Sequence, residues 1–415
     1  MDDIRWVIKK YGIWIILLIL VLFAGCMIWQ NLGEKDREDS VKKTDTTEEA
    51  GNDANQEKGY DLPVDEKAEE KAVKDGKEKM MDIKETYQAF RGAAETGVLP
   101  DVAIQQMAER LEKDGNIVVE GTAYEVMHHY EKMDVFLGQA AQGKKDRVTI
   151  YELRENGDIG RSEYIYDGKD MYVLNTGFSW GEDDDIAVSD STLTRMEWFT
   201  YTEKGWFLFE YCVPQPPDVT EVIDGHDAIR VKPLEERNRE ISEKYLFPIG
   251  YQSSNLLWSD WDSEHKDKID YNALFESFYE IKYQETFPVD KYADGIPKEE
   301  FEAVLKEYLP VSEEDLQRFA VFDAATQRYA WNEQDYRSND SGALGLSLPE
   351  VIGMRGGKDG TIVLTVDAVC KSLGSDRLIR HEMIVRQEGE MIKYLSNRIL
   401  ENNMETLPEY HYRTK

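Results

Sequence analysis

The pattern of apolar and polar positions begins with one long apolar run near the N-terminus. From Ile13 to Trp29 no residue is charged. With Tyr11, Gly12 and Gln30 as its ends, the run corresponds to about 30 Å of helix, the thickness of the hydrocarbon core of a bilayer. A helix buried inside a soluble domain explains it poorly, because a domain helix needs a polar face and this one has none. The pattern therefore predicts a membrane anchor over residues 1–30.

Charged residues on the two sides of this run predict its orientation. Arg5, Lys9 and Lys10 precede it, whereas Glu34 and Asp36 follow it. Positively charged flanks resist translocation, so the short N-terminus is expected to stay in the cytoplasm. We expect a single-pass protein of the cell membrane with its body on the extracytoplasmic side.

A lipid anchor is the alternative interpretation of the same segment. Phe23–Cys26 resembles the lipobox of bacterial lipoproteins, in which Cys26 would be acylated after cleavage of the preceding peptide. Phe23 fits that motif poorly, and Met27–Trp29 continue the apolar run where lipoproteins turn polar. Both anchors place residue 31 and everything after it outside the cytoplasm.

Residues 31–79 are dominated by Glu, Asp, Lys, Thr and Asn, and their apolar residues are isolated. Tyr60 is the only aromatic residue among them. Such a composition buries too little surface to offset the entropy of ordering the backbone. We expect a disordered acidic linker here.

Periodic patterns predict a first α+β domain over residues 80–286. Helices are expected to begin near Met80, over Asp101–Lys113, and from a capping box at Thr122 and Glu125 to about Gly143. The period then changes to two, and turn residues separate strands expected at 147–154, 159–166, 170–176, 196–202, 206–213 and 228–231. Consecutive hairpins of this kind predict an antiparallel meander with helices on one face.

A second α+β domain is expected over residues 296–402. Residues 235–285 are predicted helical and close the first domain, and a Pro- and Gly-containing stretch at 287–297 suggests the boundary. A helix follows Pro297, and hairpin turns separate strands at 361–370, 378–386 and 391–398. Helices packed on an antiparallel meander are therefore expected a second time.

Charge and cysteine content narrow the classes of partner. The net charge of −33 repels phosphate backbones, which argues against nucleic acid, and favours a basic envelope protein or a cell-wall component. Besides Cys26, the chain contains only Cys212 and Cys370, and neither belongs to a CxxC motif. A single disulfide and two separate buried thiols both remain open.

Several segments resemble a known family. Tyr130–Asp134, Tyr166–Lys169, Ile296–Phe301, Asp359–Ala368 and Tyr394–Arg398 are similar to segments of uncharacterised, membrane-anchored extracytoplasmic proteins of Gram-positive bacteria. The resemblance extends over most of the chain after the linker. It implies an α+β fold and an extracytoplasmic location, and it carries no activity and no functional residues.

One catalytic motif leads to an alternative function. Gly177–Gly181 matches GxSxG, which would make Ser179 the nucleophile of an envelope serine hydrolase. That chemistry needs a sharp strand-to-helix turn and a His to accept the proton, and the residues after Ser179 show no helical apolar face. A tight loop is the better explanation.

Three further motifs, namely a zinc motif, a serine–lysine motif and an EF-hand-like acidic loop, are each incomplete. His381–Glu382 opens like HExxH, but Val385 stands where the second His belongs. Ser263–Lys266 matches SxxK, although the partner motifs of that enzyme class are missing. Glu182–Asp185 supplies oxygen ligands without the glycine and closing Glu of an EF-hand loop, so a solvated charge run is preferred. We expect no cofactor and no metal.

Trp258 and Trp261 are candidates for an aromatic interaction surface, although this spacing is more often found in a core. Because nucleophilic and charged residues are scattered along the chain, we expect no enzymatic activity. The sequence favours a binding or interaction module at the cell envelope.

Overall fold

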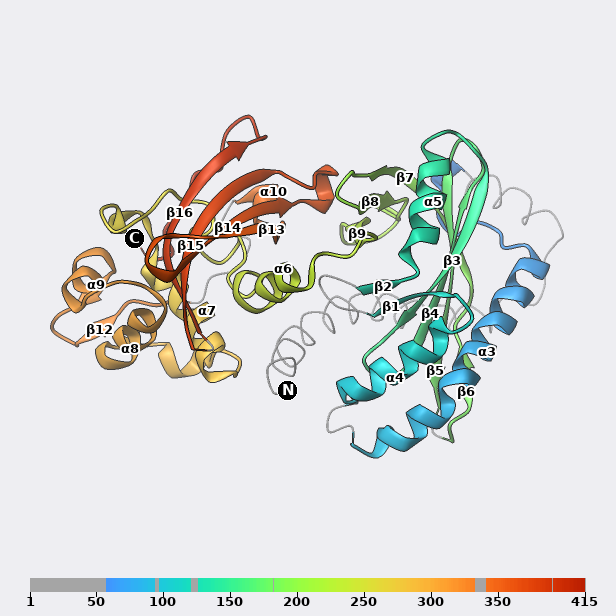
Figure 1. Ribbon diagram of the computed structural model, residues 1–415, viewed down its shortest axis with the longest axis horizontal. Coiled ribbons are helices and arrows are strands. Elements are labelled where there is room, and N and C mark those ends of the chain that lie inside the picture. Colours follow the sequence, from blue (N-terminus) through green and yellow to red (C-terminus); the bar gives the residue numbers. More distant parts are fainter. Residues whose placement is uncertain are drawn as a thin grey trace. The chain divides into compact units, whose positions relative to one another are not determined.

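Two sheets with separate cores organise the chain (Figure 1). The computed structural model describes residues 57–93, 97–120, 126–181, 183–332, 341–389 and 391–414. Within these, one unit consists of residues up to Leu234 together with Lys371–Gly374, and the other contains Glu235–Cys370 and the residues from Ser375 onward. The expected boundary at 287–297 lies inside the second unit, because Phe287 and Tyr292 are part of its core.

The N-terminal unit is built on a nine-stranded sheet in the order β2-β1-β3-β4-β5-β7-β8-β9, with β6 paired to β5. Its strands are β1 (Ile117–Glu120), β2 (Val126–His128), β3 (Asp146–Leu153), β4 (Ile159–Tyr166), β5 (Met171–Trp180), β6 (Ile186–Val188), β7 (Thr192–Tyr201), β8 (Trp206–Tyr211) and β9 (His226–Arg230). The hairpins from β3 to β5 and from β7 to β9 confirm the predicted meander. The prediction missed β1, which runs parallel to β3.

Helices cover both faces of this sheet, contrary to the expectation of one face. On one face, Met133 and Phe136 of α5 (Tyr130–Ala140) pack with Ile150. On the other face, α3 (Glu66–Phe90) and α4 (Asp101–Glu112) share a core with Tyr151. Figure 1 shows α3 and α5 on opposite sides of the strands. Alternate residues of β3 thus belong to different cores, as the pleat of a strand requires.

The long helix α3 corrects the expected linker, whose last 14 residues lie inside this helix. Asp65 caps the helix by accepting a hydrogen bond from the backbone N–H of Ala68 (3.1 Å). Ala72 and Gly76 are buried against the sheet, and a Cβ at Gly76 would overlap the ring of Phe178. The sequence concealed this helix because it packs through small residues instead of a continuous apolar face.

The helix expected from Thr122 starts later. Val126–His128 form the edge strand β2, and His129 has a left-handed backbone (φ 56°) immediately before α5. The proposed capping box lies outside the described residues. Although Val126 fits the helical period of α5, it faces a neighbouring strand.

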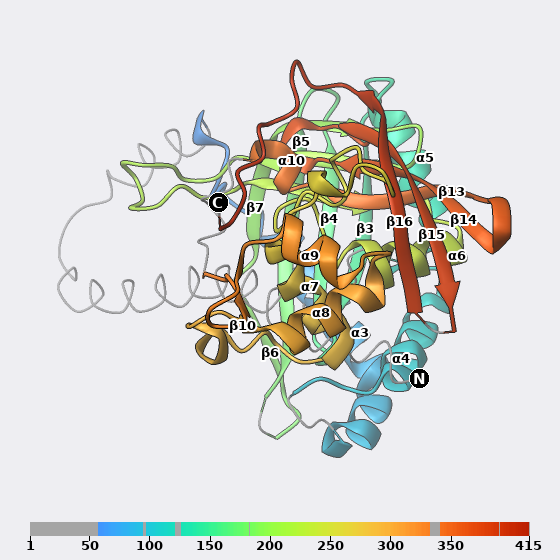
Figure 2. The same ribbon diagram turned by 90° about the vertical axis from the view of Figure 1, so that its left-hand side faces the viewer.

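The C-terminal unit packs its helices on a four-stranded antiparallel sheet, β13-β14-β15-β16 (Figure 2). The sequence predicted the last three of these strands and missed β13. The bounds are β13 (Leu348–Gly356), β14 (Thr361–Val369), β15 (Ile379–Glu388) and β16 (Met391–Asn402), with helices α6 (Glu236–Ile241), α7 (Tyr271–Tyr283), α8 (Lys298–Tyr308), α9 (Glu313–Phe319) and α10 (Gly342–Gly345). A small sheet of β10 (Ile296–Pro297), β12 (Arg328–Tyr329) and β11 (Phe322–Asp323) joins the same unit.

Of residues 235–285, which were predicted helical, only α6, the following π-turn Ser242–Leu246 and α7 form longer helical segments. The irregular segment between them is fixed to β16 by backbone bonds in both directions between Trp261 and Asn397 (3.0 Å each). Asn397 also donates to the carbonyls of Leu257 and Ser259. A buried amide therefore replaces the helical hydrogen bonds that the pattern predicted.

Candidate interaction site

Ser179, the candidate nucleophile, lies within strand β5, where it pairs with Ala187 of β6. A nucleophile elbow needs a strand-to-helix turn, whereas here an antiparallel hairpin continues past the Ser. Five of the six His residues have hydrogen-bond partners other than Ser179, namely His128, His129, His226, His265 and His381. Ser179 therefore does not occupy the strand-to-helix turn that the hydrolase alternative requires.

His381 is a core residue. Burial lowers its pKa to about 4, against the opposing effect of its hydrogen bond with Asn397, so the imidazole is neutral. Its Nδ1 lies 2.6 Å from Oδ1 of Asn397, and its Nε2 lies 2.9 Å from the Tyr251 hydroxyl. No cluster of His, Cys, Asp and Glu suited to a metal ion occurs among the described residues.

Trp258 and Trp261, the candidates for an aromatic surface, are buried in the core of the C-terminal unit, which is the alternative that their spacing favoured. Their exposed fractions are 5% and 3%. Each indole N–H donates to a nearby carbonyl, that of Ser254 and that of Leu256 respectively. The two rings stabilise the irregular segment before α7.

The acidic loop before β6 is not a fully solvated charge run. Asp184 is buried, and its carboxylate accepts hydrogen bonds from Gln88 (2.9 Å) and Arg91. Lys84 donates to its backbone carbonyl (3.1 Å). The loop therefore fixes the C-terminal part of α3, with Tyr87 stacked on Trp180 beside it (4.6 Å between ring centroids).

Cys212 and Cys370 are buried thiols of different units and no disulfide joins them, which is the second of the two alternatives that the sequence left open. Cys26 and the whole of the expected anchor lie outside the described residues. Among the residues that are described, which begin at Glu57, no helix combines the length and apolar character needed to cross a bilayer.

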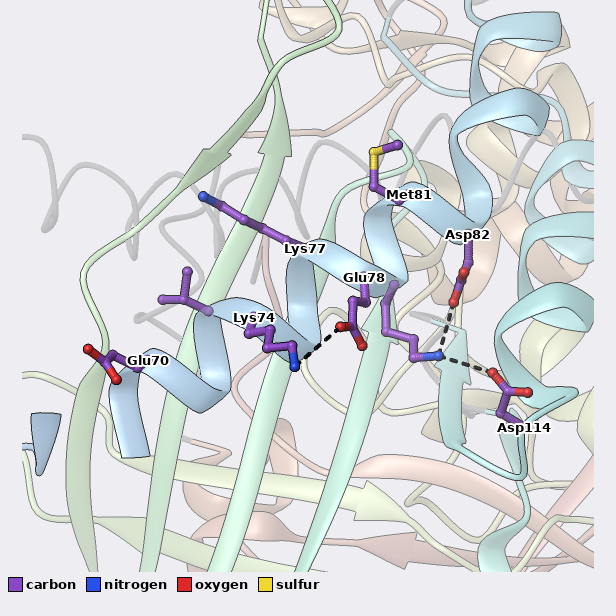
Figure 3. Close-up of a pocket in the computed structure, with 9 residues that line it drawn as sticks. Glu70, Lys74, Lys77, Glu78, Met81, Asp82 and Asp114 are labelled. Atoms are coloured by element: carbon purple, nitrogen blue, oxygen red, sulfur yellow. Dashed lines mark hydrogen bonds and ion pairs between the residues drawn. The ribbon is translucent and has the colours of Figure 1, made fainter. Parts of the chain in front are cut away.

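An open groove of about 750 Å³ follows the outer surface of α3 (Figure 3). Charged side chains of both signs line most of it. Lys74 lies 3.9 Å from Glu78, and Lys79 bridges Asp82 (3.0 Å) and Asp114 (3.3 Å). Most of the charges that line the groove are therefore paired with one another.

The loop between β8 and β9, residues 212–225, differs from the rest of the described surface. Val222 is 80% exposed, the largest exposed fraction among the large apolar side chains described, and Ile223 beside it is also exposed. Asp218, Glu221 and Asp224 surround this apolar pair in the sequence. Exposed apolar side chains on an acidic loop suit contact with a partner that is apolar and basic.

Hydrogen bonds hold this β8–β9 loop in one conformation. The side chain of Gln215 donates to the carbonyl of Ile223 (2.8 Å), and the backbone N–H of Asp218 donates to the carbonyl of Gln215 (2.9 Å). Asp224 accepts from the backbone N–H of His226 (3.0 Å). A loop that is ordered before binding loses less conformational entropy when a partner docks.

The first described residues of the chain run beside the β8–β9 loop. Lys58 lies 2.5 Å from the carboxylate of Asp218, and the Tyr60 hydroxyl donates to the same carboxylate (3.1 Å). The hydrogen bonds from Lys58 and Tyr60 hold the pKa of Asp218 below its usual range. Leu62 then pairs with Leu193 of β7. The first described residues of the chain thus lie next to Asp218.

From the sequence, residues 213–217 were interpreted only as the segment that ends the predicted strands. One signal was available: Val222 and Ile223 stand between acidic residues in a stretch without periodicity. Two adjacent apolar residues in such a stretch do not contribute to the apolar face of a helix or strand, so both side chains stay exposed on the loop.

The fold defines a two-unit α+β protein in which both units combine helices with a predominantly antiparallel sheet. The chain belongs to a family of unknown function, DUF6070, whose model matches residues 69–413. No curated protein and no solved structure matches the chain. The expected membership in an uncharacterised family is thereby confirmed, and the family itself assigns no activity to any residue.

Proposed function

We propose that this protein is a non-catalytic binding module, anchored by residues 1–30 at the outer face of the cell membrane, that docks a basic envelope protein on its β8–β9 loop. The observation that supports the proposal is the exposed Val222–Ile223 pair on an ordered acidic loop. Apolar contact supplies affinity at such a site, and the acidic residues speed encounter with a cationic partner.

The position of the loop supports a partner close to the membrane. Glu57 is separated from Gln30 by 26 residues, which span at most about 90 Å when fully extended. Because Lys58 and Tyr60 contact the loop itself, the tether would hold the loop within that distance of the bilayer. Tethering raises the effective concentration of any partner in the same membrane.

The loop can be tested in cells by photo-crosslinking. A photoreactive amino acid at Val222 should capture a specific protein, and one at the exposed position Lys144 should not. Replacing Asp218, Glu221 and Asp224 in the same chain with amides should reduce capture, as should high salt during crosslinking. Equal capture from both positions, or capture that is independent of these charges, would contradict the proposal.

The proposal that the protein is non-catalytic needs its own test. A fluorophosphonate probe should leave Ser179 unlabelled in the intact chain, because the strand provides no base to activate the hydroxyl. Labelling that disappears in Ser179→Ala would establish the serine hydrolase instead.

A further inference from the structure

A pocket of about 340 Å³ lies on the small sheet of the C-terminal unit. Its lining comes from three short segments, namely the turn before β10, strand β11 with its flanking residues, and strand β12 with the residues that follow it. The charged and aromatic side chains of the lining are Asp294, Phe322, Asp323, Arg328, Tyr329 and Trp331. A volume of this size is at the lower end of the range for small-molecule sites, so the ligand that fits it is small.

The backbone around this pocket is fixed before any ligand binds. The side chain of Asn272, on α7, accepts a hydrogen bond from the backbone N–H of Val321 (2.9 Å) and donates one to the carbonyl of Ala330 (2.7 Å). Gly295 has a φ of 87°, and a Cβ there would lie 2.7 Å from the carbonyl oxygen of Tyr329. Only glycine allows the turn to approach β12 this closely. A pocket that is formed in advance loses little conformational entropy on binding.

Arg328 has two carboxylates of the pocket as neighbours and no ion pair. Its Nη1 donates to the carbonyl of Gly295, the residue after Asp294, and Asp323 is its register partner on β11. Within the described residues, neither Arg328 nor Asp294 forms an ion pair. The other N–H donors of the guanidinium therefore remain available for a carboxylate of a ligand, which a guanidinium binds through two parallel hydrogen bonds.

The two carboxylates give the pocket an excess of negative charge. Two Asp and one Arg among the lining residues add to a net charge of −1. Hydrogen bonds from the Thr326 hydroxyl (2.8 Å) and the backbone N–H of Ala325 (2.9 Å) hold the pKa of Asp323 below its usual range. Asp294 is exposed, and its carboxylate accepts no hydrogen bond from the part of the chain that the structure describes. Both carboxylates can therefore accept hydrogen bonds from ammonium groups.

The indole N–H of Trp331 also lacks a partner. This side chain lines the pocket and is 7% exposed, and its Nε1 has no hydrogen-bond acceptor among the described residues. In contrast, the indoles of Trp258 and Trp261 in the same core each donate to a carbonyl. A buried donor without an acceptor costs free energy, and an oxygen atom of a ligand in the pocket would remove that cost.

We infer that this pocket binds a free basic amino acid, such as lysine. The carboxylate of the ligand binds Arg328 and the indole N–H of Trp331, and its two ammonium groups bind Asp294 and Asp323. The single net positive charge of such a ligand complements the net charge of the lining. The inference does not depend on the β8–β9 loop, because the pocket and the loop belong to different units of the chain.

Calorimetry with the full chain tests the inference, with L-lysine as the probe. Cadaverine, which lacks the carboxylate, and leucine, which lacks the second ammonium group, should each bind at least about tenfold more weakly than L-lysine. N-acetyl-lysine, which lacks the α-ammonium group, should be weakened to a similar extent. Equal binding of N-acetyl-lysine would assign the pocket to a lysine at the C-terminus of a peptide. That result, equal binding of cadaverine or leucine, or no binding of L-lysine at millimolar concentration would overturn the inference.

Single substitutions then locate the site. Asp294→Asn and Arg328→Gln should each weaken the binding of L-lysine about tenfold, because each removes one charge-assisted contact. Asp290→Asn is the matched control, since Asp290 is an exposed carboxylate nearby in the sequence that does not line the pocket. Its affinity for L-lysine should stay within about twofold of that of the unmodified chain. Equal weakening by Asp294→Asn and Asp290→Asn would place the binding elsewhere and contradict the inference.

The indole contact has a spectroscopic readout of its own. The NMR signal of the Trp331 Nε1–H, assigned by its loss in Trp331→Phe, should move downfield when L-lysine is added, because the N–H gains an acceptor. Asp290→Asn should show the same movement. A signal that stays in place while L-lysine binds would contradict the proposed position of the carboxylate.

Discussion

The imidazole Nε2 of His128 lies 3.0 Å from Oε1 of Glu120 on the neighbouring strand. The other ring nitrogen lies 2.8 Å from Glu112, at the end of α4. One side chain therefore links an edge strand, its neighbour and a helix. The hydrogen bond with Glu120 raises the pKa of His128, although partial burial opposes the rise.

This arrangement predicts stability that declines in mild alkali. The unfolded His titrates near pH 6.5, and the folded one titrates higher. The contribution of His128 to the free energy of unfolding is thus complete below about pH 6.5 and is lost as the pH rises through the folded pKa. Partial exposure limits it to about 1 kcal/mol. Urea unfolding at pH 6 and pH 8.5 should show this loss in the unmodified chain and little of it in His128→Asn. A pH dependence that the substitution leaves unchanged would contradict the role.

For the buried His381 we expect the opposite pH dependence of stability, in a lower pH range. Its folded pKa is about 4, so below pH 6.5 protons bind the unfolded chain more readily. Its contribution is complete above pH 6.5, and stability should fall by about 2 kcal/mol between pH 6.5 and pH 5. His381→Gln should reduce this pH dependence while lowering the overall stability. NMR titration of the imidazole provides a direct measurement, and an apparent pKa near 6.5 would refute the prediction.

At Gly76 we expect a Gly→Ala substitution to destabilise the protein, which is the opposite of its usual effect in a helix. Alanine normally stabilises a helix interior by about 1 kcal/mol relative to glycine. A Cβ at position 76 would overlap Phe178, so Gly76→Ala should destabilise the protein by about 1–3 kcal/mol. Gly138→Ala in α5 is the control, because no atom lies within 4 Å of its added Cβ. Thermal unfolding of the two variants should shift in opposite directions; stabilisation by both would show that α3 can move away from the sheet.

Truncation tests whether the first half of α3 contributes to the stability of the N-terminal unit. A chain that starts at Glu57 should keep the stability of the full chain. One that starts at Met80 loses the first half of α3 and exposes the buried Arg161, whose guanidinium lies 3.3 Å from Asp75. It should unfold at a distinctly lower temperature. Equal melting temperatures for the two chains would show that the first half of α3 adds nothing.

Topology and anchor type can be separated in cells. Protease added to cells without their wall should digest the body and leave a small anchored stub. Palmitate labelling that is lost in Cys26→Ser would identify a lipoprotein, and absence of labelling would identify a spanning helix. Full protection of the body would exclude the extracytoplasmic location.

The sequence predicted the regular hairpins and missed elements that depend on distant partners. Strands β3 to β5 and β14 to β16 were predictable because period-two runs alternate with turn residues. The short strand β1 has only four residues, and its place beside β3 depends on a parallel pairing that no local signal specifies. The part of α3 before Met80 was missed because its contact with Phe178 requires a glycine, which the pattern associates with interruption.

The same limit applies to the sites. The spacing of Trp258 and Trp261 favoured a core position, but their irregular segment was not predictable, because Asn397, which fixes it, lies far away in the sequence.

The entry of the chain beside the β8–β9 loop also has a mechanical consequence. With residues 1–30 anchored as proposed, a pull on the anchor acts first on the contacts of Lys58 and Tyr60 with Asp218. It acts next on the backbone bond from Arg195 to Gly59 and on the bridge between Leu62 and Leu193. These few bonds are loaded one after another, before the long contact of α3 with the sheet. Tension would therefore peel the entering segment away and release Asp218, so that force on the anchor alters the loop while leaving the fold intact.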